Sequence, residues 1–202
     1  WACKPFERAS QKTRRYPEES RWPCVMRKEL GDKYRIIEEG LNGRTTVLDD
    51  PIEGQKNGRK QLPPCLESHK PLDLVIILLG TNDLKKRFSM PTFDIAEGAG
   101  VLIDIVKQST TGRDGKSPQV LLLSPPEISN LPGFFEGILE GAVEKSGRFS
   151  QQFQRIAEDR DCHYLDTSDF ITVNSADGIH LETEDHRKLG QVIASKVEQL
   201  EI

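Results

Sequence analysis

The sequence predicts an α/β fold with a parallel sheet and helices on both faces. The central observation is a run of six large aliphatic residues at 74–79, bounded by Pro71 and Gly80. Such a run is too short for a membrane span and too continuous for a half-exposed strand, so it indicates a fully buried parallel strand. A helical stripe at 91–108 and a second aliphatic run at 120–123 supply the alternation of strand and helix that is typical of this class.

The other elements follow from the same patterns. Residues 20–30 are predicted to form a helix that ends at Gly31. Residues 44–71 make a long connection that should line a substrate channel or contact another subunit, with a short helix near 64–69. Thr183 is expected to cap the last helix. The remaining predicted elements are strands at 34–38, 119–124 and 163–165 and helices at 91–108 and 141–159.

Composition narrows the class of protein. With 202 residues, 36% apolar and 30% charged, the chain suits one domain covering residues 1–202. A net charge of −4 with interspersed acids and bases offers no basic stripe, which argues against a nucleic-acid partner. The longest apolar runs are too short for a membrane span. Four scattered cysteines indicate free thiols and favour a cytoplasmic location, although a signal peptide upstream of residue 1 stays open.

A polar turn, Gly-Thr-Asn-Asp at 80–83, follows the first aliphatic run. In open parallel α/β sheets, ligands bind outside the carboxyl ends of the strands, so the Asn82 carboxamide lies where chemistry is usually done. Asp83 is expected to fix the turn rather than to touch substrate. The alternative is an ordinary turn in which both residues serve the backbone.

A second motif, Asp177-Gly-Ile-His180, precedes the last helix. A carboxylate three residues before an imidazole can hold the ring by one nitrogen and leave the other to take a proton. A helix-capping turn is the simpler alternative. A metal site made of Asp177, His180 and His186 is a further alternative, but its spacing matches no common ligand pattern.

With both motifs in this order, the sequence resembles the SGNH, or GDSL-type, hydrolase family. Its third block, Gly-x-Asn-Asp, matches Gly80 to Asp83, and its fifth block, Asp-x-x-His, matches Asp177 to His180. The likeness is closer to the aryl-esterase and acyltransferase branch. That branch is suggested by Glu39 to Thr46, Asp50-Pro51, Leu62 to Leu66 and Ser124-Pro-Pro.

The resemblance implies a doubly wound, flavodoxin-like sheet of five parallel strands. It also implies a serine esterase for short-chain acyl or aryl esters that can transfer the acyl group to alcohols, needs no cofactor and forms a homo-oligomer. His180 would be the general base, Asp177 its partner, and the Gly43 N–H and Asn82 amide would form the oxyanion hole. A carbohydrate O-acetyl esterase is one alternative. A non-catalytic binding module that has lost its nucleophile is another.

The family's nucleophile block, Gly-Asp-Ser, does not occur in these 202 residues. By resemblance, the serine and the first strand are expected just upstream of Trp1. Ser124 is the rival nucleophile inside the chain, because it ends the second aliphatic run. Pro125 argues against it, since a residue before proline is pushed toward extended backbone and away from a sharp nucleophile elbow.

Overall fold

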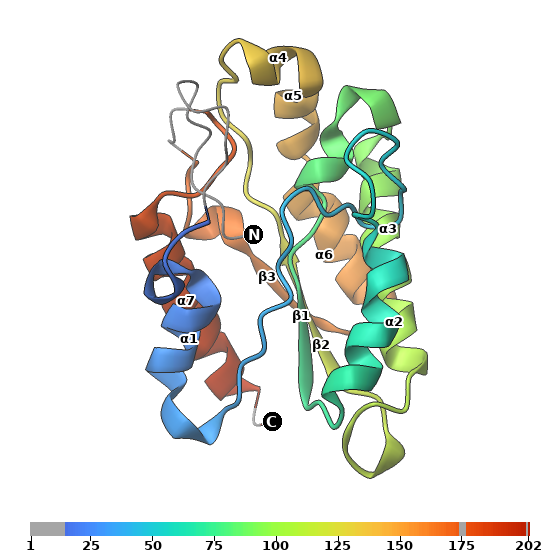
Figure 1. The fold of residues 1–202 in the computed structure, drawn as a ribbon, viewed down its shortest axis with the longest axis vertical. Coiled ribbons are helices and arrows are strands. Elements are labelled where there is room, and N and C mark those ends of the chain that lie inside the picture. The colour runs from blue at the N-terminus through green and yellow to red at the C-terminus, as the bar shows by residue number, and fades with distance from the viewer. Residues whose placement is uncertain (1–14, 174–176, 201) are drawn as a thin grey trace.

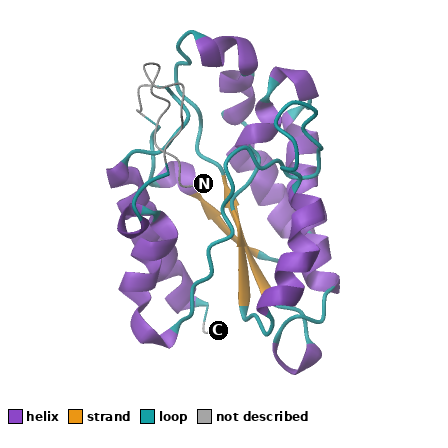
Figure 2. Cartoon of the chain, viewed as in Figure 1, coloured by secondary structure: helices purple, strands orange, loops and turns teal. Residues whose placement is uncertain are grey.

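A parallel sheet with strand order β1-β2-β3 lies at the centre of the computed structural model, which describes residues 15–173, 177–200 and 202 (Figures 1 and 2). Leu74 of β1 lies opposite Gln119 of β2, and Leu121 of β2 lies opposite His163 of β3. Because both pairs are parallel, the carboxyl ends of the strands lie at one edge. The strands are β1 (Leu74–Ile77), β2 (Gln119–Ser124) and β3 (His163–Asp166).

Helices cover both faces of the sheet, as the sequence predicts. In Figure 1, α1 and α7 pack together on one side, while α2, α3 and α6 lie on the other; α4 and α5 lie beyond the carboxyl ends of the strands. The helices are α1 (Trp22–Leu30), α2 (Gly58–His69), α3 (Thr92–Gln108), α4 (Phe134–Ile138), α5 (Ala142–Ser146), α6 (Phe149–Asp159) and α7 (Thr183–Gln199). None of the helices in the described residues is long and apolar enough to cross a membrane.

Strand β2 explains why the fold needs two helical layers. Val120 and Leu122 belong to the core beneath α3 and α6, whereas Leu121 and Leu123 belong to the core beneath α1 and α7. All four side chains are 3% exposed or less. A continuous aliphatic run is therefore buried on both of its faces, as expected for a central parallel strand.

Strand β1 differs from the prediction. Only Ile77 of its four residues is buried, and the other three are half-buried. The reason is that β2 is its one neighbouring strand in the described sheet, and its other edge lines a cavity of about 620 Å³. Residues 34–38, predicted to be a strand, form part of the opposite wall and pair with no strand. The described part of the chain thus has three strands, where the resemblance implied five.

Several helix boundaries also differ. Helix α2 begins at Gly58 and runs through Pro63 and Pro64, whereas the sequence predicts a shorter helix near 64–69. The predicted helix at 141–159 is interrupted between α5 and α6, at Gly147. Helix α7 is capped by Glu182, not by Thr183: its side chain and that of Asp185 form a reciprocal capping box.

Candidate active site

The two predicted motifs lie at the same edge of the sheet, where the three strands end. A small cavity of about 20 Å³ is lined by Thr81 from the first motif and by Ile179 and Leu181 from the second. Arg44, the residue after Gly43, lines it as well, and so does Pro125. The residues next to Gly43, Asn82 and His180 therefore meet around one point, although they are far apart in the sequence.

Asp177 and His180 form a buried pair. The Nδ1 atom of His180 lies 2.7 Å from Oδ2 of Asp177, and the two residues are 4% and 3% exposed. Oδ1 of Asp177 accepts hydrogen bonds from the backbone N–H groups of Ile179 (3.0 Å) and His180 (2.9 Å). An ionised carboxylate can only accept, so Nδ1 carries the proton and Nε2 has the basic lone pair.

The tight turn between the two residues depends on Gly178. Its φ is +72°, and a Cβ at this position would overlap the backbone carbonyl of Asn130. Glycine is therefore required both for the left-handed backbone and for the close approach of the two segments. The backbone N–H of Ser129 also donates to the Gly178 carbonyl at 2.9 Å, which ties the Asp177–His180 turn to the loop after β2.

One side of the His180 ring faces the apolar loop that follows β2, at residues 131–135. Phe135 lies edge to face with His180, with ring centroids 6.3 Å apart and an interplanar angle of 65°. The neighbouring Phe134 is 59% exposed. An apolar wall beside the imidazole keeps water from one side of the ring and offers contact area for an acyl or aryl group.

The amide of Asn82 lies in the short 3₁₀ turn Thr81–Leu84 that follows β1. The side chain is 7% exposed, and Nδ2 donates to the Arg44 carbonyl at 3.1 Å. Gly43, directly before Arg44, has φ +79°. The structure therefore joins the turn of Asn82 to the turn of Gly43, the two residues that the resemblance gives as oxyanion donors.

Asp83 fixes this arrangement, and its partner Thr46 was missed by the sequence analysis. Both carboxylate oxygens of Asp83 accept from the Thr46 backbone N–H at 3.0 Å, and Oδ1 accepts from the Thr46 hydroxyl at 2.6 Å. Burial raises the pKa of Asp83 to about 6, although the hydrogen bonds from Thr46 act to lower it. Because the two residues are 37 positions apart, no local pattern could have linked them.

Ser124 is not arranged as a nucleophile. Its side chain is fully buried, and its hydroxyl donates to Oδ1 of Asp166 at 2.7 Å. The Ser124 carbonyl also accepts from the Thr167 hydroxyl at 2.6 Å. These contacts join the ends of β2 and β3, so the residue has a structural role, in agreement with the argument from Pro125.

His186 lies deep in the fold and is not arranged as a metal ligand with Asp177 and His180. It is fully buried and lies edge to face with Tyr16, with ring centroids 5.0 Å apart. Burial lowers the pKa of His186 to about 4, so the ring is neutral at physiological pH. The Asp177–His180–His186 alternative is not among the groups in the described residues whose ligand atoms lie close enough to hold an ion.

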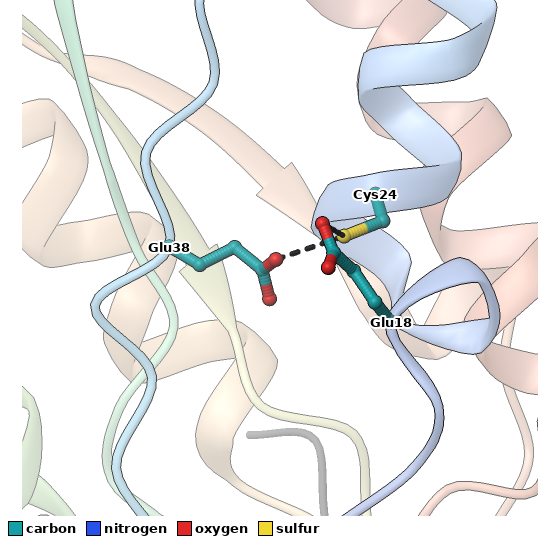
Figure 3. A group of neighbouring side chains, drawn as sticks. All are labelled: Glu18, Cys24 and Glu38. Atoms are coloured by element: carbon teal, nitrogen blue, oxygen red, sulfur yellow. Dashed lines mark hydrogen bonds between the residues drawn. The ribbon is translucent and has the colours of Figure 1, made fainter.

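One such group does occur, formed by Glu18, Cys24 and Glu38 (Figure 3). Its chemistry does not suit a cation. Burial and the hydrogen bond to Glu38 at 2.8 Å raise the pKa of the Cys24 thiol to about 12, so the sulfur keeps its proton. The Glu38 carboxylate is already paired with Arg21 (3.0 Å) and Arg27 (3.4 Å). Two nearby guanidinium groups would repel a divalent ion.

Comparisons with known proteins agree with the geometry. The profile of the GDSL-like lipase/acylhydrolase family matches residues 9–188. Est24, a carbohydrate acetylesterase from Sinorhizobium meliloti, has 42% identity and a TM-score of 0.94, over 99% of this chain and 94% of that one. The native aryl esterase of M. smegmatis has 36% identity and a TM-score of 0.92, over 99% and 93% of the two chains.

A third solved structure, a carbohydrate acetylesterase family member from Sinorhizobium meliloti, has 30% identity and a TM-score of 0.87, over 96% of this chain and 92% of that chain. No curated protein was similar enough to count as a match. The family profile covers most of the chain, and relatives well above 30% identity align over nearly all of it. The chain belongs to the GDSL-like lipase/acylhydrolase family and is a carboxylic ester hydrolase.

Proposed function

We propose that this esterase cleaves short-chain acyl and aryl esters with His180 as general base, Asp177 as its partner, and Gly43 and Asn82 as oxyanion donors. The observation that carries the proposal is the buried Asp177–His180 pair at 2.7 Å, at the same edge of the sheet as the Asn82 turn. A pair of this kind holds one tautomer and presents a basic nitrogen, which is what activation of a hydroxyl requires.

The nucleophile in this proposal is a serine encoded just upstream of Trp1. The cavity of about 620 Å³ beside β1 supports it, because its walls include the outer edge of β1 and residues 34–38, which pair with no described strand. Neighbouring strands lie about 4.8 Å apart, so one extended strand would pair with β1 there. A parallel strand in this position would end at the edge where Asn82 and His180 lie.

The reaction would proceed in two steps. His180 Nε2 takes the proton of the serine hydroxyl as the oxygen attacks the ester carbonyl, and then returns that proton to the leaving alcohol. Water repeats the sequence on the acyl-enzyme and releases the acid. The Gly43 N–H and the Asn82 Nδ2 amide would meet the negative oxygen, and loss of one such donor costs about 3 kcal/mol of barrier.

The test is hydrolysis of nitrophenyl acetate by the full-length gene product. His180→Ala and Asn82→Ala should each lose at least about 99% of kcat, and the fold should persist by circular dichroism. Wild-type turnover in both variants would refute the assignment. The intact mass of the natural protein, or the codons before Trp1, decides whether the Gly-Asp-Ser block is present.

A second candidate substrate class is acetylated carbohydrate. The 42% identity to a carbohydrate acetylesterase favours it. The same base and oxyanion donors would serve, because only the loops that bind the alcohol part differ. Release of acetate from acetylated sugars, compared with release from nitrophenyl acetate at equal concentration, separates the two classes. Acyl transfer to alcohols is the remaining proposed activity. The ratio of the new ester to the free acid, formed in water that contains dilute alcohol, tests for it.

We further propose that the protein is a homo-oligomer, with the loop of residues 44–57 as part of the contact. Ile52 at the tip of this loop is 73% exposed, the most exposed large apolar side chain in the described residues. Light scattering of wild-type protein and Ile52→Lys tests this: the variant should have the lower mass. A monomeric wild-type protein would contradict the proposal.

A cytoplasmic location also stays a prediction, supported by the free thiols Cys24, Cys65 and Cys162.

A further inference from the structure

The turn that holds Gly43 is fixed to the turn after β1 by a buried contact. Asp83 and Thr46, both fully buried, are joined by the hydrogen bonds from the Thr46 N–H (3.0 Å) and hydroxyl (2.6 Å). The next side chain back, Asn82, reaches the Arg44 carbonyl at 3.1 Å. Asn82 and Asp83, successive residues of one 3₁₀ turn, therefore bind Arg44 and Thr46, which lie one and three residues after Gly43.

A second contact fixes the same turn from the other side. Lys85 Nζ, 6% exposed, pairs with Asp50 at 3.1 Å and with Glu53 at 2.6 Å, and Arg87 pairs with the same two carboxylates at 3.0 and 2.8 Å. The Glu53 carboxylate in turn lies against Gly43: a Cβ at Gly43 would come within 2.5 Å of Glu53 Oε2. Lys85 therefore reaches the Gly43 backbone through Glu53.

The charges in this group balance. Asp50 and Glu53 carry two negative charges, and Lys85 and Arg87 carry two positive ones. Burial alone would raise the pKa of Asp50, but hydrogen bonds from the Ile52 and Glu53 backbone and from Lys85 lower it to about 2, so the carboxylate stays charged. Without Lys85, the group of Asp50, Glu53 and Arg87 would carry one net negative charge close to Gly43, where the proposed reaction develops another; Lys56, which donates to the Asn42 carbonyl at 2.8 Å, would remain as the neighbouring cation of this turn.

We propose that Asp83 and Lys85 are positioning residues of the oxyanion site: Asp83 acts through Thr46 and Lys85 acts through Glu53, and together they hold the Gly43 and Asn82 amides toward one point. This inference rests on the proposed function, because it needs both amides to bind an oxyanion. Neither residue touches substrate. Their effect falls on the charged transition state and not on the neutral ester, so kcat should change more than KM.

The positioning role of Asp83 is tested with the Thr46→Val variant of the full-length protein, with nitrophenyl acetate as substrate. The variant keeps the shape and the backbone N–H but loses the hydroxyl donor. We expect kcat to fall about tenfold or more with KM within threefold, and Thr46→Ser to restore it. Thr45→Val is the matched control, because Thr45 is equally buried and donates to the Leu48 carbonyl (2.5 Å), not to Asp83. Its kcat should stay within threefold of wild type.

The positioning role of Lys85 is tested by comparing kcat of Lys85→Met with kcat of the control variant Lys86→Met. The neighbouring Lys86 is exposed and pairs with Glu140 at 3.1 Å, away from the Gly43 turn. We expect Lys85→Met to lower kcat about tenfold, Lys85→Arg to recover most of it, and Lys86→Met to leave it unchanged. Should Thr46→Val fail to fold, Asp83→Asn replaces it, since the amide keeps the volume and one acceptor oxygen.

The outcomes separate this inference from the proposed function. If Asn82→Ala loses activity while Thr46→Val, Asp83→Asn and Lys85→Met keep wild-type kcat, the positioning role is overturned and the proposed function stands. If Asn82→Ala itself keeps wild-type kcat, the proposed function falls and this inference falls with it. Loss of thermal stability without loss of kcat in the folded variants also overturns the positioning role, because it leaves a purely structural one.

Discussion

The Gly98→Ala substitution adds a methyl group against Thr46, so its effect on the free energy of unfolding tests how firmly Thr46 is held in place. Gly98 lies in the middle of α3, where alanine normally stabilises a helix by about 1 kcal/mol. Here a Cβ would overlap the Thr46 hydroxyl oxygen and lie 3.0 Å from its Cβ. Thr46 cannot retreat easily, because its hydroxyl is bonded to buried Asp83 at 2.6 Å. Overpacking of this kind costs about 1–3 kcal/mol, so Gly98→Ala should destabilise the fold by roughly 1–2 kcal/mol.

Urea unfolding measures the change, and a loss of 1 kcal/mol corresponds to roughly 2–4 °C in Tm for a protein of this size. Gly137→Ala is the control: Gly137 is helical and exposed, with nothing within 4 Å of an added Cβ, so the variant should be as stable as wild type or more so. In a Thr46→Ala background, which lacks the overlapping oxygen, Gly98→Ala should cost less stability than it does in wild type. A Gly98→Ala variant as stable as wild type would refute the reasoning.

Four further changes have expected outcomes. Asp177→Asn presents an amide to His180 Nδ1 and should lower kcat for nitrophenyl acetate roughly 10³-fold or more with little change in the urea midpoint. Burial raises the pKa of Asp83 to about 6, so this group favours the fold most below about pH 4 and loses that contribution as the pH rises through 6. Urea unfolding between pH 4 and 7 should therefore show wild type losing stability relative to Asp83→Asn; parallel curves would contradict it. With a pKa of about 12, Cys24 should resist iodoacetamide at pH 8, as mass spectrometry can show. Lys85→Met should cost about 2 kcal/mol or more in urea unfolding, because buried Asp50 then keeps Arg87 as its one charged partner among the described residues.

Features carried by neighbouring residues could be predicted from the sequence. The aliphatic run that became β2 and the stripe that became α3 are periodic patterns, and the structure confirms both nearly to the residue. The Asp177–His180 contact spans three positions, so its geometry follows from one turn. The cap of α7 shows where local reasoning fails, because both Glu182 and Thr183 can cap a helix and only the backbone decides between them.

Features that depend on distant partners could not be predicted in this way. The same aliphatic pattern serves β2, buried on both faces, and β1, half-buried beside a cavity, because burial depends on what pairs with the strand. Residues 34–38 have the composition of a strand but no partner to pair with in the described sheet. Likewise, the sequence predicts that Asp83 fixes a turn, but not that its partner is Thr46, which lies 37 positions earlier.

The two halves of the candidate site are held by different kinds of contact. The base half of the candidate site, Asp177 and His180, is held by one turn and by hydrogen bonds between adjacent residues. The oxyanion half requires two segments to meet, and its contacts join residues 32 to 38 positions apart. Loop closure over such distances costs entropy that buried hydrogen bonds and paired charges must offset. Substitutions that loosen the fold without touching substrate should therefore weaken the proposed oxyanion site before they disturb the proposed base, His180.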